Sequence, residues 1–311
     1  MAEQIDVAAL FERRMSYPDP NAKVRLDRLV GIDDYKQRLA KILGILVNPA
    51  SLERWAAKYH AGADLLLDTV LRRPPLVILA GDVGSGKTEL AETIGDAIAR
   101  AEDIDITLLP LSLSSRGQGK VGEMTQLLAA AFDYAAGEAR KLKSSGKARG
   151  AVILLVDEAD ALAQSREAAQ MHHEDRSGVN AFIRGIDRLA NERLPAAVIM
   201  CTNRLNALDP AVRRRAADLM EFDRPDEQRR HEVLAPRLAP LGFSPSQIGE
   251  MIALTGSRAR GEPGFTFSDL TQRLLPAIVL EAYPASAVDP HRALDLAKAM
   301  VPTPQFRDEA P

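Results

Sequence analysis

The sequence predicts an α/β domain, with a mainly parallel sheet flanked by helices, followed by a small all-helical domain. Three observations support this fold class. Short continuous apolar runs alternate with segments of helical periodicity as far as Pro225. A glycine-rich segment, GDVGSGKT, directly follows the first of these runs. After Asp226 the apolar runs stop, and only helical segments interrupted by prolines follow.

The composition of the 311-residue chain is that of a globular protein, with 46% hydrophobic and 27% charged residues. The formal net charge of −3 argues against a broad basic face, so direct nucleic-acid binding is not expected. The single cysteine, Cys201, excludes an intrachain disulfide and a cysteine-based zinc cluster. No apolar run reaches the roughly 20 residues that span a bilayer, and the N-terminus lacks the apolar segment of a secretory signal. We therefore expect a soluble cytoplasmic protein without a membrane partner.

The first elements precede the glycine-rich segment. Residues 1–25 are polar and predict a short N-terminal arm. From Asp27 to Val47 apolar residues recur at helical spacing, and Asn48-Pro49 ends that helix because a residue before proline avoids the α conformation. A second helix is expected over 52–71, closed by Pro74-Pro75.

The apolar runs predict strands buried on both faces of a sheet. They cover residues 76–80, 107–113, 151–156 and 197–201. Helices are expected between them, over 87–100, 123–143 and 177–190. The predicted organisation is an arm over 1–25, an α/β domain over 26–225, a helical domain over 226–300 and a flexible tail over 301–311.

The segment 81–88 matches the phosphate-binding pattern G-x-x-x-x-G-K-[ST] at every position. Its glycines allow the backbone N–H groups to surround phosphate, Lys87 supplies a positive charge, and the Thr88 hydroxyl is a ligand for Mg²⁺. A strand before the loop and a helix after it are the context that this chemistry requires. The residues expected to bind nucleotide are Gly81, Asp82, Val83, Gly84, Ser85, Gly86, Lys87, Thr88 and Glu89.

Two carboxylates, Asp157 and Glu158, follow the strand predicted over 151–156. Ligands of parallel α/β sheets bind at the carboxyl ends of the strands, so both acids are expected at the phosphate site. Asp157 is predicted to hold Mg²⁺, and Glu158 to orient and polarise the attacking water.

With these motifs the chain resembles the AAA+ ATPases over roughly residues 26–280. The resemblance implies a P-loop NTPase sheet followed by a small helical AAA+ lid, with ATP and Mg²⁺ as cofactors. Gly31, within Leu29-Val30-Gly31-Ile32, is similar to the family's adenine-contacting segment. Asn203 stands at the sensor-1 position, where it would bond the γ-phosphate or the attacking water.

The segment 208–215 resembles the family's D-x-A-L-x-R segment, whose arginine reaches the site of a neighbouring subunit. Arg213, Arg214 and Arg215 are consecutive, so the register stays open, and we favour Arg214 and Arg215. Such an arginine stabilises charge on the transferring phosphoryl group. An arginine acting in trans requires a neighbour, so the resemblance implies a homo-oligomeric ring, expected to be a hexamer.

The chain departs from the family pattern at two places. The sensor-2 arginine is replaced within Gly264–Leu270 by serine or aspartate, and Arg273 lies one turn later. The pore-loop region, 115–123, has Lys120 where the family has an aromatic residue. The residues expected to contact a substrate in the pore are Arg116, Gln118, Lys120 and Val121.

Several further segments are similar to the pachytene-checkpoint ATPases and their bacterial antiphage-defence relatives. They include Val179-Asn180-Ala181, Ile186-Asp187 and Arg215-Ala216. This narrower resemblance implies an ATPase that disassembles or unfolds HORMA-domain proteins.

Three alternatives remain. A DNA-directed AAA+ ATPase, such as a loader or transposition regulator, would require a basic pore or a DNA-binding module, and the near-neutral charge argues against it. A chaperone of another protein substrate would share every motif named above. A nucleotide-binding scaffold without turnover is disfavoured by Glu158 and Arg214.

Overall fold

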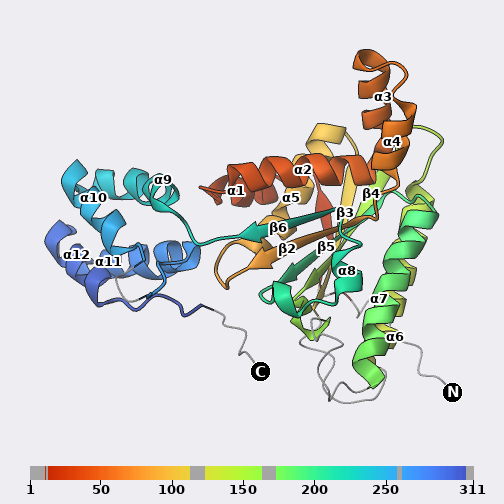
Figure 1. Cartoon of the computed structure of the whole chain (residues 1–311). Coiled ribbons are helices and arrows are strands. Elements are labelled where there is room, and N and C mark those ends of the chain that lie inside the picture. The colour runs from red at the N-terminus through yellow and green to blue at the C-terminus, as the bar shows by residue number, and fades with distance from the viewer. Residues whose placement is uncertain (1–10, 12, 113–122, 163–172, 258–260, 306–311) are drawn as a thin grey trace. The chain divides into compact units, whose positions relative to one another are not determined.

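The structure is a computed structural model that describes residues 11, 13–112, 123–162, 173–257 and 261–305. Its sheet has six strands in the order β1-β3-β4-β5-β2-β6 (Figure 1). The strands are β1 (Met15–Tyr17), β2 (Leu76–Gly81), β3 (Asp105–Ser112), β4 (Gly150–Asp157), β5 (Ala196–Thr202) and β6 (Asp218–Phe222). Strands β3, β4, β5 and β2 are parallel neighbours, whereas β1 pairs antiparallel with β3. The predicted parallel α/β sheet is confirmed.

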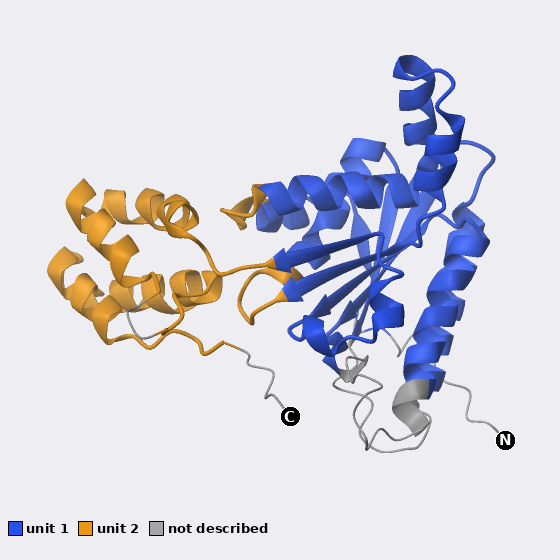
Figure 2. Cartoon of the chain, in the orientation of Figure 1, with its two compact units in different colours: residues 1–26, 34–80, 88–221 blue, residues 27–33, 81–87, 222–311 orange. Residues whose placement is uncertain are grey.

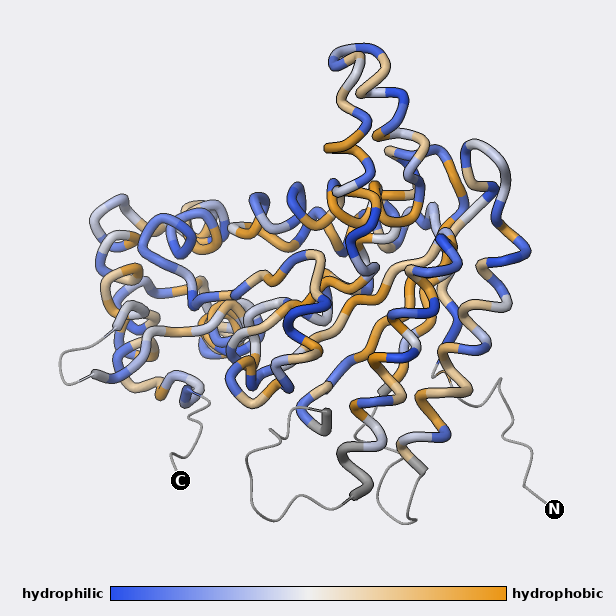
Figure 3. The backbone as a smooth tube through the Cα atoms, turned by 45° about the vertical axis from the view of Figure 1, so that its right-hand side comes forward, coloured by the Kyte–Doolittle hydropathy of each residue, from blue (hydrophilic) through white to orange (hydrophobic). Residues whose placement is uncertain are grey.

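Helices cover both faces of this sheet. Helices α2 (Asp33–Val47) and α5 (Lys87–Glu102) lie on one face, and α6 (Glu123–Leu142) and α7 (His173–Asn191) on the other (Figure 1). The central strands are apolar along their lengths (Figure 3), and every residue of β5 is buried. Packing of α6 against α7 includes an edge-on contact between Phe132 and Phe182, whose ring centroids are 5.5 Å apart. Burial on both faces explains why the sequence showed these strands as continuous apolar runs.

Two strands have no counterpart in the sequence analysis. Strand β6 reads Asp-Leu-Met-Glu-Phe, and polar residues interrupt its apolar pattern because it lies at the edge of the sheet. Strand β1 has three residues within the segment expected to be an arm, too few to produce a pattern. Helix α1 (Pro20–Arg28) follows it directly.

Two helices expected to be continuous are broken by glycine. The helix predicted from Asp27 is wrong at its start, because α1 ends at Arg28 and α2 begins only at Asp33. Between them Gly31 has φ +81°, a left-handed conformation that does not continue a helix. In the same way the helix predicted over 52–71 consists of α3 (Pro49–Tyr59) and α4 (Asp64–Leu71), with Gly62 at φ +89° between them.

The chain divides into two compact units (Figure 2). The first comprises residues 1–26, 34–80 and 88–221, and the second comprises 27–33, 81–87 and 222–311. The second unit therefore contains the segment before α2, the glycine-rich loop and the C-terminal helices. In the described part of the chain, no helix is both long enough and apolar enough to cross a bilayer.

The C-terminal helices form a core of their own. They are α9 (Glu227–Leu238), α10 (Pro245–Leu254), α11 (Leu275–Ala282) and α12 (Pro290–Ala299), with a π-helical turn over Asp269–Leu274 before α11. Ser244 and Gln247 form a capping box at the start of α10. Leu234, Met251, Phe265 and Leu274 are buried in the core between these helices.

Candidate nucleotide site

The glycine-rich loop has the local geometry of a phosphate-binding loop. It begins where β2 ends at Gly81, and α5 begins at Lys87. Gly84 and Gly86 have φ values of +77° and +93°, which glycine adopts without strain. Sixteen residues of helix follow, so the positive end of the helix dipole lies at the loop. The strand–loop–helix context that the motif requires is present.

Lys87 is buried within this loop. Its ammonium group donates to the carbonyl oxygens of Gly81 and Asp82, each at 2.8 Å, and to the hydroxyl of Ser85 at 3.2 Å. These acceptors hold the Lys87 ammonium group inside the loop. In loops of this kind the backbone N–H groups surround a phosphate. The loop is therefore suited to a polyphosphate anion.

The Thr88 hydroxyl lies beside the acid at the end of β4. Thr88 Oγ1 donates to Asp157 Oδ1 at 3.3 Å. Burial raises the pKa of the Asp157 carboxyl above its usual value, while hydrogen bonds from the Glu158 N–H and the Thr88 hydroxyl oppose this shift. A hydroxyl and a partly buried carboxylate are oxygen ligands of the kind that Mg²⁺ takes together with substrate phosphates and water. The residues present therefore fit the expected ion.

Thr88 and Asp157 are two protein ligands, fewer than a metal site made of protein side chains alone requires. Among the described residues, no group of three His, Cys, Asp or Glu side chains could hold a metal ion. Mg²⁺ at nucleotide sites needs only one or two protein ligands, because phosphate oxygens supply others.

Glu158 has an unusual backbone conformation, with φ +50°. Its N–H donates to Asp157 Oδ1 at 2.9 Å, and its side chain is exposed. A left-handed conformation in a non-glycine residue is uncommon and is concentrated at functional sites. Glu158 lies between the end of β4 at Asp157 and the 3-10 turn that begins at Ala159.

Asp160 connects the segment after β4 to the end of β5, and the sequence analysis missed it. Asp160 Oδ1 accepts hydrogen bonds from the Thr202 hydroxyl at 2.5 Å and from the Asn203 N–H at 3.0 Å. Asp160 Oδ2 accepts from Asn203 Nδ2 at 3.3 Å. The position of the Asn203 amide is therefore set by Asp160. Two features of the sequence could have indicated this role of Asp160. It is the third acid of the segment 157–160, and Thr202 ends the adjacent parallel strand.

Glu89 occupies the first turn of α5, as expected for its place after Thr88. Its carboxylate accepts two hydrogen bonds from Arg25, at 2.7 and 2.8 Å, and Arg25 also bonds Glu92. These bonds anchor α1 to α5. The role seen for Glu89 in this unit is therefore structural, and its assignment to nucleotide binding stays a prediction.

The segment around Gly31 lies beside the loop within the second unit. A Cβ added to Gly86 would lie 3.9 Å from Leu29 Cδ2 and 4.0 Å from Ile32 Cδ1. A Cβ added to Gly31 would lie 3.2 Å from the ring of Phe267 and 3.4 Å from Arg229 Cβ. The structure thus brings together the segment predicted to contact adenine, the loop and the C-terminal helices.

The arginines after β5 differ in their partners. Arg215 makes a two-pronged ion pair with Asp187, with distances of 2.8 and 3.0 Å, and also donates to the carbonyl of Ala211. Arg213 and Arg214 are exposed at the end of α8 (Pro210–Arg213). Between the two favoured residues, Arg214 is thus the better candidate for a group that leaves its own subunit.

The four predicted pore-loop residues lie outside the described residues. They are Arg116, Gln118, Lys120 and Val121.

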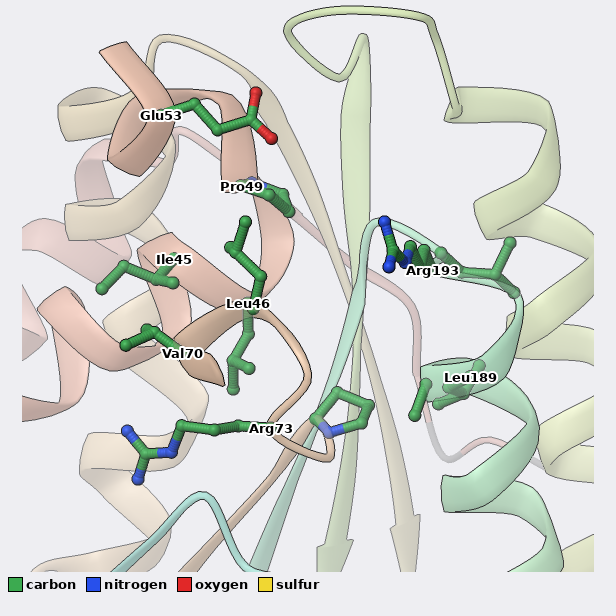
Figure 4. A pocket seen from close by; sticks show the side chains of 12 residues that line it. Ile45, Leu46, Pro49, Glu53, Val70, Arg73, Leu189 and Arg193 are labelled. Carbon is green, nitrogen blue, oxygen red and sulfur yellow. The ribbon is translucent and has the colours of Figure 1, made fainter. Parts of the chain in front are cut away.

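A hollow of about 130 Å³ lies in the first unit, at the amino ends of the strands (Figure 4). Its lining includes Pro75 and Leu194, which precede β2 and β5, and the apolar side chains of Ile45 and Leu189. It therefore opens at the amino ends of the strands. Ligand sites of parallel sheets form at the carboxyl ends, so this hollow is separate from the phosphate chemistry.

Comparison with known proteins identifies the family. Residues 77–224 match the family model described as "ATPase family associated with various cellular activities (AAA)". A curated relative, CD-NTase-associated protein 6 of Escherichia coli strain MS 115-1, is 66% identical over 300 residues, covering 96% of each chain. The chain belongs to the AAA family of ATPases. The resemblance to AAA+ proteins is confirmed, and with it ATPase activity and nucleotide binding.

Solved structures support the narrower resemblance. A Rhizobiales Trip13 is 55% identical with a TM-score of 0.76, covering 94% of this chain and 99% of that one. A chain of the E. coli MS115-1 HORMA:CdnC:Trip13 complex is 63% identical with a TM-score of 0.91, covering 98% of this AAA ATPase and 100% of that chain. The predicted similarity to this branch of the family is confirmed.

Proposed function

We propose that this AAA ATPase is a Mg²⁺-dependent homohexameric ring in the cytoplasm that remodels HORMA-domain proteins in antiphage signalling. The observation that carries the proposal is similarity along the whole chain. The similar E. coli structure contains a HORMA protein together with its Trip13 chain, and the two Trip13-like chains share 63% of their residues. Inferring a shared substrate from this level of sequence identity is more direct than inferring it from the AAA fold alone.

The proposed chemistry is hydrolysis of the β–γ phosphoanhydride of ATP. The loop 81–87 binds the phosphates through its N–H groups and Lys87. Thr88 and Asp157 hold Mg²⁺, which neutralises phosphate charge when bound. Glu158 accepts a proton from the attacking water, and Asn203, positioned by Asp160, orients the water or the γ-phosphate.

The ring is proposed because Arg214 is assigned to the site of a neighbouring subunit. Arg214 is exposed, and no hydrogen bond or ion pair of its guanidinium is seen within the described part of the chain. An exposed guanidinium at the end of α8 suits stabilisation of phosphoryl charge in a neighbouring site. Arg215 is proposed instead to brace this turn through Asp187.

The proposed pore loop contains Arg116, Gln118, Lys120 and Val121. Cationic side chains contact acidic groups and backbone carbonyls, and their methylene stems cover apolar surface. Gripping of a substrate peptide is therefore proposed without an aromatic residue.

Glu158→Gln tests the chemistry. The amide retains the shape of the side chain but cannot accept the water proton, so ATP should bind normally while turnover falls about a hundredfold or more. Titration with a fluorescent ATP analogue and a phosphate-release assay measure the two quantities. Glu53→Gln, an exposed residue of α3, is the matched control and should behave as the parent. Parental turnover by Glu158→Gln would remove Glu158 from the mechanism.

Mixing two inactive variants tests the ring. Subunits with Arg214→Ala and subunits with Glu158→Gln carry lesions that the proposal places on opposite sides of each interface. Some interfaces of a mixed ring pair an intact Arg214 with an intact Glu158, so partial activity should return. Sedimentation confirms assembly. No recovery at any mixing ratio in assembled rings would assign Arg214 to its own subunit.

A further inference from the structure

Arg224 connects the phosphate loop to the C-terminal helices within the second unit. It lies two residues after β6, and its side chain is 11% exposed. Its Nε donates to Asp82 Oδ2 in the loop at 2.9 Å. Its Nη1 donates to the carbonyl of Gly264 at 2.6 Å. One guanidinium therefore binds the loop and the segment that follows α10.

A second contact joins the same two segments. The Ser268 N–H donates to the carbonyl of Gly84 at 3.0 Å. A Cβ added to Gly84 would lie 2.7 Å from Ser268 Cβ and 2.9 Å from Thr266 Oγ1. The segment 264–268 is thus packed directly against the loop, at the place where other AAA+ proteins carry the sensor-2 arginine.

Arg273, the alternative noted from the sequence, is bound elsewhere. It donates to Asp269 at 2.5 Å and to the carbonyl of Val301 at 3.1 Å. Arg224, in contrast, is hydrogen-bonded to Asp82 of the phosphate loop.

The Arg224–Asp82 ion pair is largely buried, with side chains that are 11% and 18% exposed. Removing two charges from water largely offsets their attraction, so a buried ion pair is weak support for stability. In addition, Arg224 Nη2 is buried and has no hydrogen-bond partner among the described residues. Unsatisfied buried donors are rare and destabilising, which points to a function for this arrangement.

The charge of Asp82 suggests that function. Asp82 is the second residue of a loop suited to a polyanion, and the negative charge of its carboxylate repels phosphate. Arg224 neutralises it and at the same time bonds Gly264. A guanidinium suits this double task because its donors are arranged in a fixed fork.

We propose that Arg224 is a positioning residue for ATP hydrolysis, which neutralises Asp82 for nucleotide binding and couples the loop to the segment 264–268. The proposal rests on nucleotide binding by this AAA ATPase and is independent of the HORMA substrate. It predicts that neutralising Asp82 and linking the loop to the segment 264–268 can be lost separately in different variants.

Four variants separate the two roles, with a fluorescent ADP analogue as the probe. Arg224→Ala should weaken binding about tenfold or more, because Asp82 loses its ion pair with Arg224. Asp82→Asn alone is the reference variant of the cycle, and the double variant should bind within about threefold of Asp82→Asn, because no carboxylate charge remains to repel phosphate. Arg224→Lys retains the charge and should bind within about threefold of the parent, but with a lower kcat because an ammonium group cannot make both bonds in the same geometry.

Arg230→Ala is the matched structural control. Arg230 also bonds backbone carbonyls, those of Pro225 and Ile252, but no residue of the loop. It should lower the melting temperature and leave nucleotide affinity unchanged. Melting temperatures of all variants show which of them fold.

Two results would overturn the proposal. One is parental affinity in folded Arg224→Ala, and the other is a double variant that binds no better than Arg224→Ala. If Arg224→Ala does not fold, parental kcat in Arg224→Lys decides against the bridging role. A parent protein that binds no nucleotide would instead refute the nucleotide function itself.

Discussion

Asp269→Asn removes the charge at the centre of the second unit's hydrogen-bond network. The Asp269 side chain is fully buried, and Oδ2 accepts from the N–H groups of Thr266 and Thr303. Oδ1 accepts from the Thr303 hydroxyl and from Arg273. The Asp269 N–H in turn donates to Thr266 Oγ1, which lies 2.9 Å from where a Cβ on Gly84 of the loop would be. The substitution therefore perturbs both the fold of this unit and the support of the loop.

The contribution of the Asp269 charge to the free energy of unfolding follows from the pKa of Asp269. Burial alone would raise this pKa, but the hydrogen bonds from Thr266, Thr303 and Arg273 lower it from 3.8 to about 2. Each unit of pKa corresponds to about 1.4 kcal/mol, so the charged form contributes about 2 kcal/mol to the free energy of unfolding. Because the folded pKa is depressed, this contribution is complete above pH ~4 and is lost as the pH falls through about 2. Roughly half of it should be gone at pH 3.

Urea unfolding followed by far-UV circular dichroism at pH 7 and pH 3 measures this effect. Asp269→Asn should be less stable than the parent by about 2 kcal/mol or more at pH 7, and the gap should narrow by about 1 kcal/mol at pH 3. Glu250→Gln, a half-exposed residue 3.5 Å from Lys298, is the control and should change stability by less than about 1 kcal/mol. A gap that is the same at both pH values would refute the assignment of this stability to the Asp269 charge.

Two further predictions concern the site. Lys87→Ala should abolish detectable ATP binding, because the ammonium held by Gly81, Asp82 and Ser85 is the loop's cation; parental affinity in a titration would contradict this. Asp160→Asn should lower kcat about tenfold while ATP affinity stays within about threefold, because the amide can no longer accept every bond from Thr202 and Asn203. An unchanged kcat would show that Asp160 does not position the sensor residue.

The sequence predicted the parts of the fold that are encoded locally. The strands β2, β3, β4 and β5 are buried on both faces, so each left a continuous apolar run. The phosphate loop was predicted because its chemistry requires fixed residue types at fixed spacing. Asp157 was expected beside Thr88 because parallel strands end at one edge of a sheet, and the Thr88 hydroxyl does donate to its carboxylate.

The rest depended on tertiary contacts. Strand β6 is at an edge and lacks an apolar run, so its sequence alone does not distinguish it from a loop. The ion pair between Arg224 and Asp82 joins residues 142 positions apart, and nothing local to Arg224 indicates that partner. The choice of Arg214 over Arg215 became possible only when Asp187 was found 2.8 Å from the Arg215 guanidinium.

Release of a labelled peptide from a closed HORMA-domain complex tests the proposed function most directly. The parent protein with ATP and Mg²⁺ should release the peptide, and Glu158→Gln should not, although it binds ATP. Fluorescence anisotropy of the peptide reports release, with ATP hydrolysis measured in the same samples. Hydrolysis by the parent without any release of peptide would contradict the HORMA assignment and leave an AAA ATPase that acts on a different substrate.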